Sequence, residues 1–265
     1  MSAAAKAMEA NLWDRVLFLA KGRKEAVIQD SPDLLLVDSG LLSSGFNRIG
    51  RCSLHPRYGV PRIEAAINHF RERNTPIPFS WTIGPVSGHG ALEPTLTELG
   101  LAPVAQKWGM VAAWNELRLP NNAADSLDIK SVSNKQGVID FAGLVATLSK
   151  PPNPDVLNLY TDANLAIVMP NSPMKLYVCY AGGKPVATAE AYYAHGVVGF
   201  WNILADTTVA GKGYAPAMLM AALRDAKRSG QTTAFLQAET ASKPIYERLG
   251  FKAIGMFTDY QYAKK

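Results

Sequence analysis

The sequence predicts an α/β protein with a mixed sheet, made of two halves in which helices and strands follow the same order. Strand-like and helix-like apolar runs alternate along the 265 residues, which is typical of an α/β fold. A Gly182-Gly183-Lys184 turn separates two β-rich runs, a pattern that predicts an antiparallel hairpin. Residues 119–126 contain a short polar run after Pro120 and have the composition of a linker. We therefore expect one half at 1–118 and the other at 127–265.

The elements of the first half follow from apolar runs bounded by turn residues. These runs predict a strand at 46–54, a helix at 62–73, a strand at 79–83 and a helix at 92–99. Gly100 follows the last helix directly, where a glycine in the left-handed conformation commonly ends a helix.

The second half repeats this order after its hairpin, which we expect at 175–180 and 185–193. A turn near His195-Gly196 leads into a strand at 197–205, a helix at 213–229, a strand at 234–237 and a short helix that ends at Gly250-Phe251. Leu99-Gly100-Leu101 and Leu249-Gly250-Phe251 hold the same place in each half, which favours an ancient duplication. The alternative is that any two α/β segments resemble one another.

Composition narrows the class of protein. Lys and Arg number 27 against 22 Asp and Glu, the pI is about 9.1, and the basic residues are dispersed, so the charge predicts no nucleic-acid partner. Cys52 and Cys179 form neither a disulfide framework nor a metal motif. No apolar run approaches membrane-spanning length, which predicts a cytoplasmic protein without a membrane partner.

The most informative motif is the glycine turn Ala210-Gly211-Lys212-Gly213-Tyr214-Ala215 at the start of the helix at 213–229. Such a turn exposes backbone N–H groups at the positive end of the helix dipole, an arrangement that suits a diphosphate. A P-loop would need a glycine in place of Asp206 and a Ser or Thr after its lysine. A dinucleotide fingerprint would need a glycine in place of Pro216 and a parallel start, which the hairpin disfavours.

This turn and the segment Pro244-Ile245-Tyr246-Glu247-Arg248-Leu249-Gly250-Phe251 closely resemble two motifs of the GNAT-superfamily N-acetyltransferases. The first is similar to the family's acyl-CoA turn, Arg/Gln-x-x-Gly-x-Gly/Ala, and the second to its closing signature. The motifs stand in the family's order and spacing, and the likeness covers roughly 127–262. Ala210 stands where the family has Arg or Gln, which removes one side-chain contact to the diphosphate, and Lys212 could compensate through its charge.

The first half resembles the degenerate N-terminal partner of two-domain members, through segments at 8–13, at 38–41 with 46–47, and at 79–85. Its counterpart of the turn, Arg57-Tyr58-Gly59-Val60-Pro61, has a single glycine, and Leu96 stands where the second half has Tyr246. The resemblance thus implies a tandem GNAT-like fold. Its N-terminal copy has neither the two-glycine turn for the diphosphate nor a tyrosine to act as general acid. This copy would therefore be structural and help to shape the acceptor pocket.

The resemblance implies transfer of an acetyl group from acetyl-CoA directly to a primary amine, without a covalent enzyme intermediate or a metal. The strand end at 202–205 should diverge from its neighbour, so that free backbone groups hold the pantetheine arm and polarise the thioester carbonyl. The implied cofactor-binding residues are Ile203, Leu204, Ala205, Gly211, Lys212, Gly213, Tyr214, Ala215, Ser242 and Tyr246.

Two side chains are the candidates for acid–base catalysis. Tyr246 is the candidate general acid, because a phenol with a pKa near 10 is protonated at neutral pH and can donate to a leaving thiolate. Glu190 is the candidate base if it points toward the centre of the sheet. Asp206 and His195 are its alternatives, although Asp206 can cap the cofactor loop and His195, beside Gly196, is expected in an exposed turn.

The alternative function is a non-catalytic module that binds or senses CoA, favoured by Ala210 and opposed by the Tyr246 signature. A protein-interaction scaffold is a third and weaker possibility. The acceptor pocket is expected near residues 150–154 and the helix that follows. Small amines, amino acids and peptide N-termini stay open as acceptors, as do monomer and homodimer.

Overall fold

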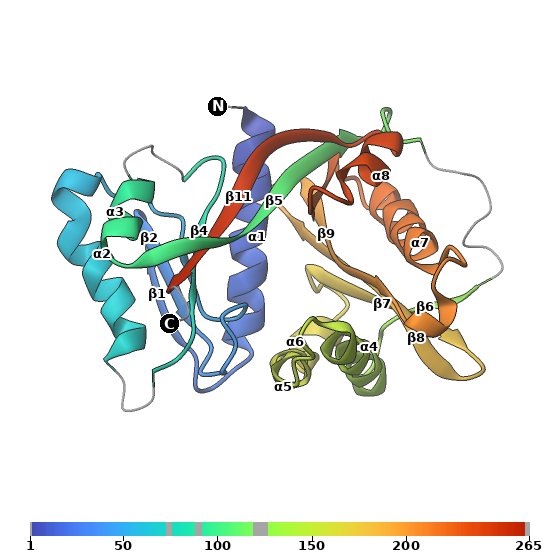
Figure 1. Ribbon diagram of the computed structural model, residues 1–265. Coiled ribbons are helices and arrows are strands. Elements are labelled where there is room, and N and C mark those ends of the chain that lie inside the picture. The colour runs from blue at the N-terminus through green and yellow to red at the C-terminus, as the bar shows by residue number, and fades with distance from the viewer. Residues whose placement is uncertain (1, 73–75, 88–91, 119–126, 263–265) are drawn as a thin grey trace.

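The computed structural model describes residues 2–72, 76–87, 92–118 and 127–262. Within them, eleven strands form one continuous sheet in the order β1-β2-β3-β4-β11-β5-β10-β9-β8-β7-β6 (Figure 1). The strands are β1 Val27–Ser31, β2 Leu34–Asp38, β3 Arg48–Gly50, β4 Ser80–Ile83, β5 Leu101–Ala113, β6 Asp128–Ser131, β7 Met174–Ala181, β8 Lys184–Ala194, β9 Val197–Ala205, β10 Thr233–Ala238 and β11 Lys252–Tyr262. The helices are α1 Ala3–Lys21, α2 Pro56–Arg71, α3 Leu92–Glu98, α4 Lys135–Leu148, α5 Asp155–Asp162, α6 Asn164–Val168, α7 Tyr214–Arg228 and α8 Lys243–Arg248, with a 3-10 turn η1 at Thr207–Val209.

Two long strands cross between the N-terminal part (residues 2–118) and the C-terminal part (residues 127–262). β11 lies between β4 and β5, and β5 lies between β11 and β10, with antiparallel pairing throughout. Each part therefore contributes a strand that is inserted next to the other part's strands, as the red and green ribbons in Figure 1 show. The two parts share one sheet instead of forming separate layers.

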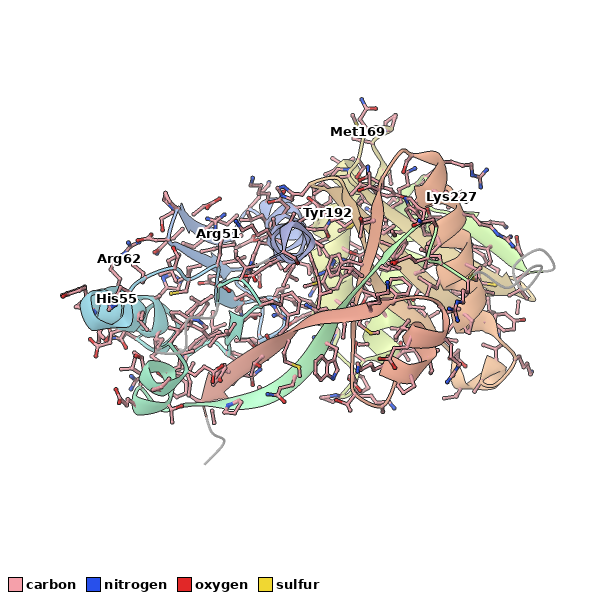
Figure 2. All side chains as sticks on the ribbon, turned by 90° about the horizontal axis from the view of Figure 1, so that it is seen from above. Arg51, His55, Arg62, Met169, Tyr192 and Lys227 are labelled. Carbon is pink, nitrogen blue, oxygen red and sulfur yellow. The ribbon has the colours of Figure 1, made fainter. Side chains whose placement is uncertain are left out.

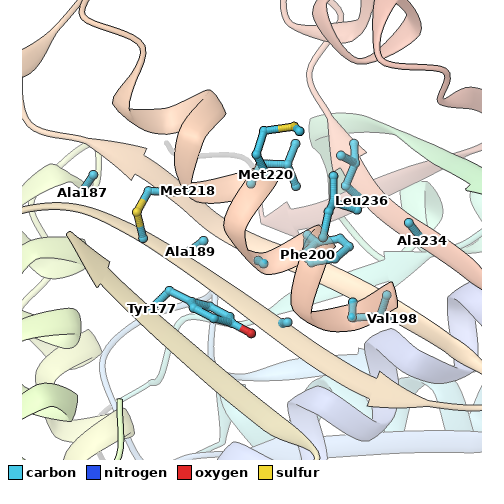
Figure 3. Close-up of a cluster of buried hydrophobic side chains, with 14 of the residues drawn as sticks. Tyr177, Ala187, Ala189, Val198, Phe200, Met218, Met220, Ala234 and Leu236 are labelled. Carbon is cyan, nitrogen blue, oxygen red and sulfur yellow. The ribbon is translucent and has the colours of Figure 1, made fainter. Parts of the chain in front are cut away.

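One face of the C-terminal sheet is covered by α7. Because side chains alternate along a strand, Tyr177, Ala187, Ala189 and Phe200 all point to this face. The helix presents Met218, Leu219, Ala222 and Leu223 to them, and all four are buried. Figure 3 shows Met218 of the helix in this cluster together with Tyr177, Ala187, Ala189 and Phe200 of the sheet. This packing is the main core of the C-terminal part, and it fixes the helix start directly beside the end of β9.

The opposite face carries α1 in the middle and α4–α6 at one side (Figure 1). Two strand glycines let α1 approach closely. A Cβ on Gly109 would lie 2.6 Å from Met8 Cε, and one on Gly199 would lie 2.5 Å from Asn11 Oδ1. Asn11 donates to the carbonyl of Tyr192 at 3.0 Å, and the hydroxyl of Tyr192, which is labelled beside α1 in Figure 2, donates to the carbonyl of Asp14 at 3.1 Å. A helix from the first residues is thereby fastened to the C-terminal part.

Most predicted elements agree with the structure, and three expectations need comment. The strand predicted at 46–54 is only Arg48–Gly50, because Arg51 adopts a positive φ of 50° and ends it. The segment Arg57–Pro61, interpreted as the counterpart of the glycine turn, is part of the helix Pro56–Arg71, so that interpretation is wrong. The predicted linker at 119–126 lies outside the described residues.

The hairpin turn is confirmed, with φ of 58° at Gly182 and 76° at Gly183.

Candidate functional site

The candidate site begins where two parallel strands separate. β9 pairs with β10 from Val197 to Phe200 only, although β9 continues to Ala205. On its other side the register with β8 shifts, so that Asn202 and Ile203 stand opposite a single residue of β8, and Asn202 has a positive φ of 48°. The bulge turns β9 away from β10, which bears out the expected divergence at 202–205.

A cavity of about 390 Å³ occupies the opening between the separated strands, and we call it the slot. Four of the predicted cofactor residues line it, namely Ile203, Leu204, Ser242 and Tyr246. The remaining wall comes from Phe200, Trp201, Asn202, Leu236, Gln237, Glu239 and Lys107. Strand edges, a short helix and one residue of the distant β5 therefore meet around a single opening.

The glycine turn follows the free end of β9 and opens α7. Gly211 and Gly213 both have left-handed φ values, 73° and 78°, and a Cβ added at either would meet nothing within 4 Å. Among the described residues, the N–H groups of Gly213, Tyr214 and Ala215 have no acceptor, as expected for the first turn of a helix. The Lys212 ammonium donates to the carbonyl of Thr208 at 3.2 Å. These residues form an exposed main-chain cradle suited to an anion, placed at the outer end of β9.

Tyr246 lies on α8, just beyond the end of β10, and is half-buried in the wall of the slot. Its ring packs edge-on to Phe251 with 6.2 Å between centroids. Burial raises the pKa of Tyr246 above the ordinary value of a tyrosine, so its hydroxyl is protonated at neutral pH. No described residue accepts a hydrogen bond from this hydroxyl, which leaves its proton available to a ligand.

Glu190 points to the face of α1 and is fully buried, with an exposed fraction of 0%. Arg15 of α1 donates to both of its carboxylate oxygens, through Nε and, at 3.0 Å, through Nη2. The hydroxyl of Tyr160 donates to it at 2.5 Å and the amide of Asn202 at 2.8 Å. The carboxylate is thus held by three side chains from three elements and lines neither cavity described here.

The same network shifts the pKa of its donors. Burial lowers the pKa of Arg15, but the attraction of Glu190 and Tyr160 and their hydrogen bonds outweighs it and raises the pKa. Burial first, and then the charge of Glu190, raise the pKa of Tyr160 far above its ordinary value. Arg15 is therefore always a cation, and Tyr160 always a hydroxyl donor.

A second cavity of about 450 Å³ adjoins the slot, and we call it the interlobe cavity. Both cavities are lined by Lys107, Trp201, Asn202 and Gln237, so they meet at these residues. α1, β3 and the loop before β3 form one side of it, and α4, α5 and β9 form the other. The predicted acceptor region at 150–154 contributes Lys150 and Asn153.

Lys107 of β5 stands at the junction of the two cavities. Burial, and then the neighbouring charge of Arg48, lower its pKa, while Asp259 and Glu239 oppose the shift. Sequence reasoning missed this residue, and it also missed Arg15, Tyr160 and the role of the Asn202 side chain. The one local signal was a single charge at Lys107 within the strand-like apolar run at 101–113.

The alternatives to Glu190 lie elsewhere. His195 sits in the β8–β9 turn with a φ of 55°, and its Nε2 is 2.9 Å from Asp14. Asp206 accepts a hydrogen bond from the N–H of Thr208 at 2.8 Å and caps η1, as its capping interpretation requires. Neither lines the slot or the interlobe cavity. The described residues contain no group of three or more His, Cys, Asp or Glu able to hold a metal ion, and no helix among them is long and apolar enough to cross a bilayer.

Comparison with known proteins adds three findings. Residues 145–251 match the family model described as the acetyltransferase (GNAT) family. Comparison with curated proteins gives no match. Many solved structures share the fold, and nearly the whole chain is covered by a GCN5-related N-acetyltransferase from Kribbella flavida, with a TM-score of 0.70, 15% identity, and coverage of 98% of this chain and 96% of that one.

Two further structures are informative. A GCN5-related N-acetyltransferase from Sphaerobacter thermophilus aligns with a TM-score of 0.61 and 14% identity, over 97% of this chain and 89% of that one. A glucosamine N-acetyltransferase region of a fungal multi-domain GH3 β-N-acetylglucosaminidase aligns with a TM-score of 0.62 and 13% identity, over 94% of this chain and 34% of that one. At these identities the structures show a common fold.

Proposed function

With residues 145–251 as a GNAT-family domain, we propose that this protein moves an acetyl group from acetyl-CoA directly to a primary amine. The observation that carries the proposal is the slot between β9 and β10, which holds Tyr246 in its wall and opens into the interlobe cavity. One opening suits a thioester arm and the other suits an amine, and the two meet at four shared residues.

The residues present fit the proposed donor. The cradle of Gly211, Lys212, Gly213, Tyr214 and Ala215 lies at a helix N-terminus, where the N–H groups of Gly213, Tyr214 and Ala215 have no acceptor among the described residues and suit the diphosphate. Ile203, Leu204 and Ala205 offer a strand edge that β10 does not use, and Ser242 lies at the start of α8 in the slot. Acetyl-CoA would supply an acyl thioester, the activated group that an amine can attack.

The chemistry then needs two proton transfers. The amine nitrogen forms a bond to the thioester carbon, the bond from that carbon to sulfur breaks, and the sulfur leaves as a thiolate. We propose that Tyr246 gives its proton to this thiolate. Free N–H groups of the diverging strand would stabilise the charge on the carbonyl oxygen.

The acceptor must lose a proton from its ammonium form before its nitrogen can attack, and the nitrogen loses a second proton as the amide forms, which balances the proton that Tyr246 gives to the thiolate. The first of these protons needs an acceptor. Glu190, the predicted base, is committed to Arg15, Tyr160 and Asn202, so we propose that it positions these side chains instead. Glu239 is the acidic side chain that lines the slot, and it is exposed to solvent. We propose Glu239, directly or through water, as the acceptor of this proton.

Calorimetric titration with acetyl-CoA and with free CoA tests the donor site, alongside Gly213→Trp, which would cover the cradle. We expect wild-type binding in the micromolar range typical of such cosubstrates and a loss of at least tenfold in the variant. A folded wild-type protein that binds neither compound would overturn the proposal. Binding followed by thiol release with an amine, reduced in Tyr246→Phe, would support it.

Two observations favour the second candidate, a CoA-binding module without catalysis. Ala210 lacks the side chain that would add a contact to the diphosphate, and the predicted base is neutralised by Arg15. Such a module would bind acetyl-CoA in the same titration but release no thiol with any amine.

A further inference from the structure

The lining of the interlobe cavity carries charge of one sign. Its cationic residues are Arg15, Arg48, Lys107 and Lys150, and no Asp or Glu is among the described residues that line it. A cavity lined in this way attracts anions and repels an acceptor whose only charge is its ammonium.

Two of these cations are paired with carboxylates that do not themselves line the cavity. Arg15 is paired with Glu190, and Arg48 lies 3.1 Å from Asp259, which also accepts a hydrogen bond from Thr82 at 2.6 Å. Four cations and two carboxylates leave the site with a net charge of 4 − 2 = +2. Even the paired arginines keep free donors, since no described residue accepts from Nη1 of Arg15 or Nη2 of Arg48.

The other two cations, Lys107 and Lys150, have no ion-pair partner among the described residues. Lys107 is the notable one, because it is half-buried at the junction, and the charges of Asp259 and Glu239 offset the cost of burying its ammonium only in part. Surface cations of the N-terminal part differ, since Arg51 and Arg62 in Figure 2 pair with Asp30 and Asp33. A bound carboxylate would supply the counter-charge that the cavity lacks.

Neutral polar groups in the lining of the interlobe cavity suit a carboxylate as well. Ser43, Ser149, Asn153 and Gln237 line the cavity, and the Asn153 amide donates to the Ser43 hydroxyl at 2.9 Å. A volume of about 450 Å³ is at the lower end of the range for small-molecule sites, so the acceptor is small. The apolar remainder, such as Val145 and Leu159, would contact a short carbon chain.

We propose that the acceptor is a small amine that also carries a carboxylate, an amino acid or related amino-carboxylate, held by the unpaired positive charge of the interlobe cavity. This inference rests on the proposed acetyltransferase function and names the class of its substrate. The carboxylate lies among the cations, and the amine faces the slot. Lys107, at the junction, disfavours the ammonium form of the amine and so favours the nucleophile.

The test compares matched acceptors by release of free CoA from acetyl-CoA. Glycine and β-alanine are measured against glycinamide and β-alaninamide, which differ only in the carboxylate, and against glucosamine. The amides have the less basic amines, so intrinsic reactivity at neutral pH works in their favour. We expect kcat/KM for the acids to exceed that for the amides by about tenfold to hundredfold, the usual worth of a charged hydrogen bond.

Variants locate the preference. Lys107→Met and Lys150→Met should each lower the ratio of acid to amide kcat/KM, with the larger fall in Lys107→Met because Lys150 is exposed and screened. Lys227→Met removes a lysine from the outer face of α7, remote from the cavity, and serves as the matched control (Figure 2). An acid preference that survives both cavity variants would overturn the proposal.

The outcomes separate this inference from the function on which it rests. Thiol release with amides or glucosamine at least equal to release with the acids would keep the acetyltransferase and overturn the amino-carboxylate acceptor. If acetyl-CoA binds but no amine reacts, titration of the CoA-loaded protein with succinate and with succinamide tests whether the interlobe cavity binds a carboxylate. Binding of succinate that is lost in Lys107→Met supports an anion site, and equal or absent binding of the two overturns it. No binding of acetyl-CoA overturns both proposals.

Discussion

Replacing Glu190 by Gln separates its two possible roles, because the variant keeps the shape of the side chain and removes its charge. If Glu190 positions Arg15, Tyr160 and Asn202, the variant leaves the Arg15 cation without its counter-charge while only 15% of that side chain is exposed. If Glu190 is the general base, the variant removes the fall of kcat/KM at acidic pH that protonation of the base causes, and it changes the free energy of unfolding little.

The expected cost follows from the contacts. Removing one partner of a buried ion pair costs about 3–5 kcal/mol. We take the lower end, about 3 kcal/mol, because Arg15 borders the interlobe cavity and water can reach its free nitrogen. With about 2–4 °C per kcal/mol for a chain of this size, the melting temperature should fall by about 6–12 °C.

A double-mutant cycle with Arg15→Met isolates the pair. The double variant Arg15→Met/Glu190→Gln should recover part of the loss, with a coupling free energy of about 2 kcal/mol, because no uncompensated charge stays buried. Thermal unfolding gives the free energies, and kcat/KM against pH gives the catalytic role. Glu190→Gln that melts like the wild type but loses the acidic limb of the rate profile would refute the positioning role and restore Glu190 as the base.

Three further predictions concern other parts of the site. Tyr246→Phe should lower kcat by about 10²-fold with little change in acetyl-CoA affinity. Because burial raises the pKa of Tyr246, kcat of the wild type should stay constant to above pH 10 and then fall, and kcat of the variant should show no such fall at alkaline pH. Lys107→Met should raise the melting temperature at pH 7. Because the pKa of Lys107 is lowered in the folded state, the unfolded state binds more protons, and the wild type becomes more stable only as the pH rises toward 10. A lower melting temperature of the variant would show that the charge of Lys107 is compensated in the folded protein. Glu239→Gln should reduce kcat/KM at low pH more than at high pH, where the acceptor amine is already neutral, and a uniform fall across pH would argue against proton transfer to Glu239.

The parts of the site that sequence predicts are the ones encoded by neighbouring residues. The glycine turn, the divergence of β9 and the position of Tyr246 all depend on short segments between 197 and 251, where turn chemistry and helix capping are local. The hairpin and most element bounds follow for the same reason. The interpretation of 57–61 as the counterpart of the glycine turn was wrong because the helix Pro56–Arg71 runs through this segment and accommodates Pro61 in its interior.

The acceptor side could not be predicted in this way. Arg15 meets Glu190 across 175 residues, and that contact exists only because α1 packs over glycines of two distant strands. Lys107 reaches the junction because β5 is inserted between β10 and β11, a pairing for which the sequence has no local signature. Glu190 was expected to point toward the sheet centre. Which side chain meets it there depends on the tertiary fold alone.

The insertion of β5 and β11 into each other's half also determines what happens if the chain is severed. A cut between Arg118 and Leu127 would yield two pieces, each of which ends in a long strand made to lie beside the other piece. Apart, each piece would expose strand edges and invite aggregation. Mixed, the two should reassemble through the ten residue pairs that join β11 to β5, so recovery of the proposed acetyl transfer would report that two tethered fragments have met in solution.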